Sequence, residues 1–511
     1  MTTTAVQLIT KNTAWFTFGS IGQKLFSFLY FTIIAMVFGI EGTARYFFAL
    51  SFTALFAMFA DCGISPVLTR EVAKDRTRGI GLFRTAIVCK IFAIVGTLIV
   101  IAVITIVAGY SAATQQTLAI AAAALAIDAI HMACYAVLRG IQRVHYEAIG
   151  IIVSQIIVTA VGIAILITRA GLRFGGGSND TLLTIREPIN VVWILFPFIL
   201  ASVTNLVIAS YGLMREGILR ELRVVAAGSW RWLVRTAAPF AATSILARIY
   251  TYSDTFILSL LATGTAIGYY STPFKIAFAF QFFPLAFMGA LYPAMSAAAV
   301  GNRARVTLMF TEAVRVLLII ALPIAFGIGI LADRILVTVY GVAFLPSAVP
   351  LALLAAAIPF TFVNFPAGYL LNACDRQIVN TKLIAIVTAT NITLNLIFIP
   401  QFGAVGAAIS ALVATILLSI LNFGAVHRVA RYEFHVIFHA FLRIFVACLA
   451  MSAVILFVRS WPLGVTIAFG AATYIAIAFI ARAIKLDDLR LLASAFRRRT
   501  PSVAALDVTA D

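Results

Sequence analysis

The sequence predicts an all-α polytopic membrane protein with about 14 transmembrane helices. Hydrophobic residue types make up 63% of the 511 residues and charged types only 11%, whereas soluble proteins average about 45–50% and about 25%. Apolar runs of the roughly 20 residues that a helix needs to cross a bilayer recur along the whole chain. Because these runs are continuously apolar rather than alternating, they exclude a transmembrane β-barrel.

Fourteen stretches qualify as membrane spans. In chain order they are 13–39, 45–67, 84–109, 115–138, 147–168, 190–213, 233–261, 266–295, 312–332, 346–371, 377–399, 403–426, 436–458 and 462–483. The loops between them are short, so we expect no extramembrane domain. Two basic stretches, 214–235 and 484–499, suit either helices lying on an anionic inner leaflet or ordinary positively charged cytoplasmic segments.

The Lys and Arg side chains orient these spans. If the N-terminus is cytoplasmic, most of the 37 Lys and Arg residues fall in cytoplasmic segments. The outer loops then hold six: Arg45, Arg169, Arg173, Arg186, Arg334 and Arg459. Cytoplasmic loops carry such an excess, so we predict a multi-pass protein of the cytoplasmic (plasma) membrane with both termini cytoplasmic. The same excess accounts for the net charge of +18, and no soluble basic domain exists that would make nucleic acid a partner.

A short repeat divides the chain into halves. GTARYF at 42–47 follows the first span and GTAIGYY at 264–270 follows the seventh. Six spans separate the copies, so the halves share one orientation, as in transporters built from parallel repeats. We therefore predict five segments: an N-lobe at 1–213, a cytoplasmic amphipathic linker at 214–232, a C-lobe at 233–426, two extra spans at 436–483 and a basic cytoplasmic tail at 484–511.

Motifs for catalysis and for cofactor binding are missing from the sequence. No GxxxxGK[ST] occurs, so the chain has no P-loop for ATP. His435 and His439 have i,i+4 spacing, but no glutamate follows the first histidine as it does in zinc metalloproteases. The five cysteines form no short-spaced pair. We therefore predict no metal, no cofactor and no enzyme, which favours transport.

Seven ionisable residues fall within predicted spans, where charge is costly and indicates function. They are Lys24, Asp61, Lys90, Asp128, Arg248, Asp254 and Lys275. We expect Lys90 to extend toward the inner surface, and Asp61 to pair with a loop arginine such as Arg70. Asp128 shares a helix face with His131 and Tyr135, which favours a structural hydrogen-bond cluster over a proton relay.

The other four of these residues are stronger candidates for function. Asp254 and Lys275 lie at similar predicted depths in neighbouring spans, so they could form an ion pair. Lys24 and Arg248 are the deepest cations, and their offset of 224 nearly equals that of the repeat. Two cations facing each other between repeats would suit an anionic substrate such as a pyrophosphate. Asp254, Asp61 and Asp128 are candidates for ion coupling or ion pairing.

Three stretches resemble one transporter family. KNTAWFTFGSIGQKLFSFLYFTIIAMVFGIEGTARYFFALSFTALFAMFADCGISPVLTREVAK, at 11–74, resembles the opening of polysaccharide-type flippases. These belong to the multidrug/oligosaccharidyl-lipid/polysaccharide exporter superfamily. RIYTYSDTFILSLLATGTAIGYYSTPFKI, at 248–276, resembles the start of their second half, and NLIFIPQFGAVGAAISA, at 395–411, is similar to their turn between spans 11 and 12.

The resemblance implies two six-helix lobes around a central cavity that opens alternately to each side. It implies movement of a polyprenyl-pyrophosphate-linked oligosaccharide from the cytoplasmic to the outer face, driven by an ion gradient. In such flippases, cations of spans one, seven and eight are thought to meet the pyrophosphate; here these are Lys24, Arg248 and Lys275. The implied partners are the lipid-linked oligosaccharide, membrane lipids and membrane proteins of polysaccharide assembly.

Two alternatives stay open at this point. One is a flippase for the lipid-linked peptidoglycan precursor, with drug-transporting relatives behind it. The other, from a different class, is a membrane-embedded polysaccharide polymerase or glycosyltransferase. Such an enzyme should carry a large outer loop with charged catalytic residues. The longest outer loop here has about twenty residues, and Asp180 and Glu187 are its acids, so we favour the flippase.

Overall fold

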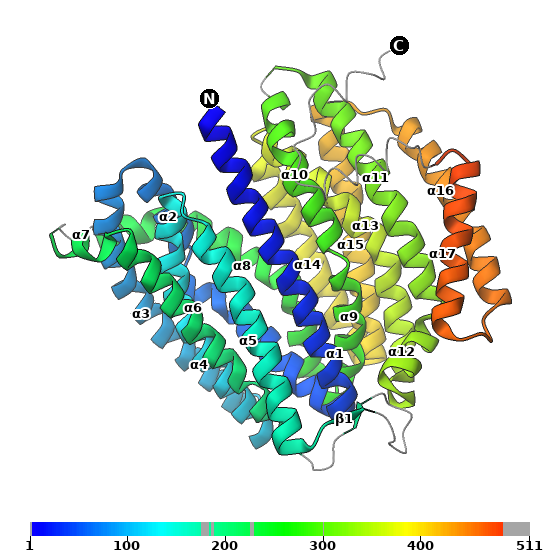
Figure 1. The fold of residues 1–511 in the computed structure, drawn as a ribbon, viewed down its shortest axis with the longest axis horizontal. Coiled ribbons are helices and arrows are strands. Elements are labelled where there is room, and N and C mark those ends of the chain that lie inside the picture. Colours follow the sequence, from blue (N-terminus) through cyan, green and yellow to red (C-terminus); the bar gives the residue numbers. More distant parts are fainter. Residues whose placement is uncertain (1–2, 175–182, 185–188, 225–228, 300, 484–511) are drawn as a thin grey trace. The chain divides into compact units, whose positions relative to one another are not determined.

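The computed structural model describes residues 3–174, 183–184, 189–224, 229–299 and 301–483 (Figure 1). In chain order its elements are α1 (Thr3–Asp61), α2 (Ile64–Lys74), α3 (Arg76–Val107), α4 (Ala112–Gly140), α5 (His145–Ala170), β1 (Arg173–Phe174), β2 (Leu183–Thr184), the 3-10 helix η1 (Val191–Ile194), α6 (Phe196–Arg215), α7 (Ile218–Val224), α8 (Trp230–Leu261), α9 (Gly264–Ala279), α10 (Phe282–Ala299), α11 (Arg303–Ile330), α12 (Ala332–Tyr340), the 3-10 helix η2 (Val342–Ser347), α13 (Ala348–Ala373), α14 (Gln377–Phe402), α15 (Ala404–Ala430), α16 (Phe434–Phe457) and α17 (Leu463–Ile480). The predicted tail at 484–511 and the acids Asp180 and Glu187 lie outside the described residues.

Long apolar helices confirm the predicted class of polytopic all-α membrane protein. Twelve segments of the described chain are long and apolar enough to cross a membrane. One of them, Ile21–Asp61, covers the first two predicted spans. Helix α8 covers the seventh predicted span and is not among the twelve, because Arg248, Asp254 and several hydroxyl side chains make it less apolar. The predicted number of fourteen is therefore approximate.

Gly39 divides α1 into two helices. Its φ of 62° and ψ of −158° interrupt the helix, and this region of backbone space is essentially open only to glycine. The break brings the rings of Phe31 and Phe47 to a centroid distance of 6.2 Å. Along a straight helix these residues would lie roughly 24 Å apart. The turn confirms the predicted boundary between the first two spans.

Replacing Gly39 by alanine should therefore destabilise the protein. An added Cβ meets no atom within 4 Å, so the expected loss of about 1–3 kcal/mol in unfolding free energy comes from backbone strain alone. Gly22→Ala is the matched control, because Gly22 lies in the same helix and its Cβ also has open space. This control should be neutral or slightly stabilising. Chemical denaturation of the detergent-solubilised protein measures both, and equal stability of the two variants would contradict the prediction.

The first of two compact units comprises Met1–Ala279, Val339–Ser347 and Thr388–Ala407. Within it, α1 packs against α4, α5, α8 and α9, and α6 packs against α4 and α5. One core cluster joins α2, α3, α4, α6, α7 and the start of α8; Leu68, Ala136, Ile218 and Leu233 are fully buried there. The predicted linker therefore includes a short helix, α7, that is anchored on this unit.

The second unit comprises Phe280–Thr338, Ala348–Val387 and Ala408–Asp511. Its core joins α10, α11, α13, α15, α16 and α17. The two helices that match the predicted extra spans, α16 and α17, pack against each other and against α11. The hydroxyl of Tyr474 in α17 donates to the carbonyl of Ile319 at 2.7 Å. The two units are defined by packing within each unit, whereas the lobes were predicted from a sequence repeat. The lobe boundaries at 213 and 233 therefore stay a prediction.

The eighth predicted span consists of two helices. A turn at residues 280 and 281 separates α9 from α10. Pro284 lies in the first turn of α10, where a missing backbone N–H removes no helical hydrogen bond. Lys275 thus belongs to a short helix of the first unit.

Candidate functional site

Two of the predicted substrate-binding cations, Lys24 and Lys275, lie on helices that pack together in the first unit. Lys24 is in α1 and Lys275 is in α9. The ammonium of Lys24 lies 4.4 Å from the ring centroid of Phe278. The ammonium of Lys275 lies 5.6 Å from the ring centroid of Phe31 and 5.8 Å from that of Phe47. Both ammonium groups therefore face aromatic rings within the range of cation–π attraction.

These two lysines lack a negative partner in the described part of the chain. Neither forms an ion pair there, although each lies on a helix long and apolar enough to belong to a membrane span. A lone cation near the middle of a span costs about 2.5–3.5 kcal/mol on insertion scales. An aromatic contact returns about 0.5–2 kcal/mol. Because no carboxylate of the described chain neutralises their positive charge, the two lysines should attract an anion.

Aromatic packing holds the two lysines in place. The rings of Phe47 and Phe274 lie 5.7 Å apart, and those of Phe274 and Phe278 stack at 5.5 Å. Our sequence reasoning missed these phenylalanines. Phe274 and Phe278 lie at i,i+4 spacing around Lys275, which is a usable signal. The contact of Phe31 with Phe47 depends on the break at Gly39 and has no local signal.

Arg248, the third predicted substrate-binding cation, is exposed on α8. It belongs to the same unit as Lys24 and Lys275. Among the described residues it forms no ion pair. The structure therefore places all three cations in one unit, and the pairing of Lys24 with Arg248 as equivalents of a repeat stays a prediction.

Asp254 does not pair with Lys275, contrary to the pairing that the sequence suggested. Its carboxylate accepts hydrogen bonds from the Tyr270 hydroxyl at 2.7 Å and from the Asn395 amide at 2.6 Å. Asn391 accepts from Asn395 at 3.0 Å and from the Ser253 hydroxyl at 3.1 Å. The correction has a physical reason: three helices, α8, α9 and α14, surround this carboxylate with neutral donors.

Asp254 is only 5% exposed and has no cation within ion-pair distance among the described residues. Asn395, whose amide nitrogen donates to Asp254 and to Asn391, has an Oδ1 atom without a hydrogen-bond partner. Carboxylate and amide oxygens are the ligands that a hard cation prefers. The two asparagines at i,i+4 spacing in an apolar span were a signal that sequence reasoning did not use.

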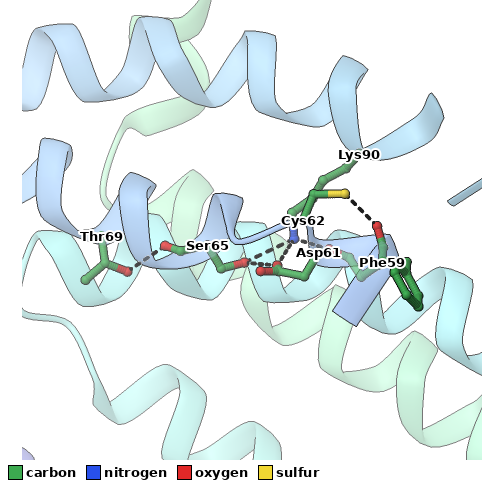
Figure 2. Close-up of polar contacts among 7 residues, drawn as sticks. Phe59, Asp61, Cys62, Ser65, Thr69 and Lys90 are labelled. Atoms are coloured by element: carbon green, nitrogen blue, oxygen red, sulfur yellow. Dashed lines mark hydrogen bonds and ion pairs between the residues drawn. The ribbon is translucent and has the colours of Figure 1, made fainter. Parts of the chain in front are cut away.

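Asp61 and Lys90 form an ion pair in which the lysine is buried and the aspartate side chain is 25% exposed (Figure 2). The Lys90 ammonium is fully buried. It donates to Asp61 at 2.6 Å, to the Ser65 hydroxyl at 3.0 Å and to the Ala129 carbonyl at 2.8 Å. Ser65 also donates to Asp61.

Two expectations about this pair were wrong. Lys90 does not extend to the inner surface, because its three acceptors surround it inside the helix bundle. Arg70 pairs with Glu71, not with Asp61. The cause is the break at Cys62 and Gly63, where both residues have positive φ. It ends α1 at Asp61 and places Ser65 of α2 beside the carboxylate.

Contacts in α4 confirm that Asp128, His131 and Tyr135 share one face. Asp128 Oδ1 lies 3.4 Å from His131 Nδ1, and the rings of His131 and Tyr135 meet edge to face at 5.4 Å. The Tyr135 hydroxyl donates to Asn205 of α6 at 3.0 Å. The described residues contain no group of three His, Cys, Asp or Glu side chains that could hold a metal ion.

The sequence matches the model of a known protein family. The model of the polysaccharide biosynthesis proteins matches residues 9–299, more than half of the sequence. The chain belongs to this family. The match includes Lys24, Arg248 and Lys275, and also Asp61 and Lys90.

Two curated relatives of this family member come from Haloferax volcanii. It is 24% identical over 181 residues to the probable low-salt glycan biosynthesis flippase Agl15, which covers 35% of this chain and 38% of that protein. It is 27% identical over 176 residues to the probable flippase AglR, which covers 34% of this chain and 37% of that protein. The matched part thus spans less than two fifths of either relative.

Solved structures establish the fold of this family member. The structure of the lipid II flippase MurJ in an inward closed conformation covers 91% of this chain and 98% of its own, with a TM-score of 0.71 and 16% identity. An inward-facing multidrug resistance MATE transporter of the MOP superfamily covers 80% of this chain and 96% of its own, with a TM-score of 0.58 and 16% identity. The fold is that of MurJ and the MATE transporters.

Proposed function

We propose that this protein is a flippase that moves a polyprenyl-pyrophosphate-linked oligosaccharide from the cytoplasmic to the outer face of the membrane. The observation that carries the proposal is the pair Lys24 and Lys275. These cations lie inside membrane-spanning helices, face aromatic rings and have no carboxylate partner among the described residues. Membership in a polysaccharide biosynthesis family and a fold shared with a flippase support it.

The substrate site in this proposal consists of Lys24, Lys275 and Arg248. A pyrophosphate offers several anionic oxygens, which bind Lys as a point charge and Arg through two parallel hydrogen bonds. Neither lysine has a carboxylate partner among the described residues, so an anion bound between them would supply the missing negative charge. The aromatic rings of Phe31, Phe47 and Phe278 hold the ammonium groups without neutralising them.

Asp254 is our candidate for coupling transport to an ion gradient by alternating access. Its carboxylate is buried among neutral donors, so a proton or sodium ion would neutralise it. Asp61 is engaged with Lys90, and Asp128 with His131, which makes them weaker candidates. Both termini lie in the cytoplasm in this proposal, as the distribution of Lys and Arg predicts. Its protein partners are polysaccharide-assembly proteins of the same membrane.

The similarity to a lipid II flippase favours one second candidate, flipping of the lipid-linked peptidoglycan precursor. Both substrates would present a pyrophosphate to the same cations. Sugar contacts would therefore decide between them. A direct comparison of the two substrates is the test that separates the candidates.

The purified protein, reconstituted in proteoliposomes, should accelerate transfer of a lipid-linked oligosaccharide between leaflets. Access of a membrane-impermeant glycosidase to the lipid from outside measures that transfer. An imposed proton or sodium gradient should raise the rate. Faster transfer of the lipid-linked peptidoglycan precursor would favour the second candidate. No acceleration of either lipid would contradict the flippase.

The same assay tests Asp254. The Asp254→Asn variant should transfer lipid at the basal rate and lose its response to the gradient. The reason is that an amide carries no charge for a proton or sodium ion to neutralise. Asp375→Asn is the control, because Asp375 is an exposed carboxylate outside the membrane spans. It should keep the gradient response. A gradient response retained by Asp254→Asn would remove this residue from the coupling step.

A further inference from the structure

Residues 211–237, from the end of α6 to the first turns of α8, form a linker segment that is rich in arginine. It contains two acids, Glu216 and Glu221. Glu221 pairs with Arg76 at 2.6 Å, and Glu216 pairs with Arg143 at 3.0 Å. Arg76 also donates to the carbonyl of Glu216 at 2.9 Å. Both carboxylates are thus neutralised, by Arg76 at the start of α3 and by Arg143 in the loop between α4 and α5.

The apolar side of the same segment also faces the protein. Ile218 of α7 and Leu233 of α8 are fully buried in the core cluster that includes α2, α3 and α4. Arg78 of α3 lies over the ring of Trp232, 4.8 Å from its centroid. Figure 1 shows α7 at the same end of the unit as α2. The segment is therefore packed on the unit through its acids and its apolar residues.

Four arginines of this segment are exposed at the protein surface. Arg215, Arg220, Arg231 and Arg235 are exposed and form no ion pair among the described residues. In the first two turns of α8 the exposed positions are Trp230, Arg231, Val234 and Arg235, whereas Leu233 and Ala237 are buried. This i,i+1,i+4,i+5 pattern is one helix face. We call the four arginines together with Trp230 the linker face.

Exposed apolar side chains lie next to these arginines. Trp230 is 58% exposed, and Met214 is 64% and Tyr211 56% exposed at the end of α6. Trp and Tyr are enriched where a membrane protein meets the headgroup layer. Arginines beside them attract anionic lipids, with a gain of about fivefold in binding for each cation. Water-exposed loops need no such combination of aromatic and cationic side chains.

We propose that the linker face binds the headgroups of anionic phospholipids. Charge complementarity carries this assignment: both acids of the segment are paired with other arginines, so the four exposed arginines keep a positive charge that anionic headgroups can neutralise. The sequence left two interpretations of this stretch open, a surface helix and an ordinary positive loop. The pairing of both acids with arginines of the first unit, beside four exposed arginines that form no ion pair among the described residues, favours the surface helix. The proposal does not depend on what the protein transports.

Binding of phosphatidylglycerol to the purified full-length protein in detergent tests the proposal. The quadruple variant Arg215→Gln/Arg220→Gln/Arg231→Gln/Arg235→Gln should bind it at least tenfold more weakly. Phosphatidylcholine with the same acyl chains should bind equally to both proteins. Trp230→Ala, which leaves the charge unchanged, should weaken phosphatidylglycerol binding severalfold. Melting temperatures of the variants in lipid-free detergent report whether they fold.

A matched control tests whether any four exposed arginines would contribute equally to lipid binding. Arg303, Arg376, Arg428 and Arg431 are four exposed arginines of the second unit. Their quadruple Gln variant should bind phosphatidylglycerol within twofold of the unmodified protein. An equal loss in this control would overturn the proposal. Displacement of the lipid by millimolar inorganic phosphate, or by polyglutamate, would also overturn it in favour of a free anion or an acidic protein partner.

Discussion

Lys90→Met should lower the free energy of unfolding by about 3–5 kcal/mol. The substitution leaves the Asp61 carboxylate, the Ser65 hydroxyl and the Ala129 carbonyl without their donor in a buried site. Breaking one side of a buried pair is costly because the remaining charge loses its compensation. Asp61→Asn should destabilise by a similar amount, since it leaves a fully buried ammonium facing a neutral amide. Denaturation of the purified protein in detergent measures both.

The double variant Asp61→Asn/Lys90→Met makes this prediction sharper. It should be less destabilised than the sum of the single variants by more than about 1 kcal/mol, because each single change leaves a charge that the other removes. The exposed i,i+4 pair of Glu41 and Arg45 is the control. Arg45→Gln should cost no more than about 0.5 kcal/mol. Additive effects of Asp61 and Lys90 would show that the two residues do not act as a pair.

Alanine at Lys24, Lys275 or Arg248 should each slow flipping by about 10- to 100-fold. That range corresponds to the loss of one hydrogen bond to a charged group, about 1.5–3 kcal/mol. Arg248→Lys should keep part of the rate, because the charge survives while the two-pronged geometry is lost. Transfer of lipid-linked oligosaccharide in proteoliposomes, normalised to the amount of inserted protein, is the measurement.

Stability separates a binding role from a structural role for these cations. Lys24→Ala and Lys275→Ala remove partly buried cations that form no ion pair among the described residues, so melting temperatures should stay equal or rise. A structural cation would show the reverse, with stability and transport falling together. Lys382→Ala, at an exposed lysine of α14, is the control and should leave both unchanged. Normal flipping by the three alanine variants would defeat the proposed substrate site.

Much of the fold could be predicted from local sequence. The free energy of placing a residue in a bilayer depends mainly on the residue itself and its close neighbours. Runs of apolar residues therefore located the membrane helices. The boundary near Gly39 followed from the end of the first apolar run, and the structure adds that the backbone of Gly39 makes the turn. The exposed arginines of the linker were equally visible in the sequence.

The partners of the charged side chains were decided only by the tertiary structure. Asp61 and Lys90 are 29 residues apart, and Asp254 and Asn395 are 141 apart. Hydropathy and spacing say which residues are unusual in a membrane, but not which helices lie side by side. The sequence by itself thus determined a many-helix membrane protein with seven intramembrane charges. The packing of α1 on α9 decided that Lys24 and Lys275 meet aromatic rings, whereas the packing of α3 on α1 gave Lys90 the carboxylate of Asp61. Such pairings depend on contacts between distant segments, and no local free energy specifies them.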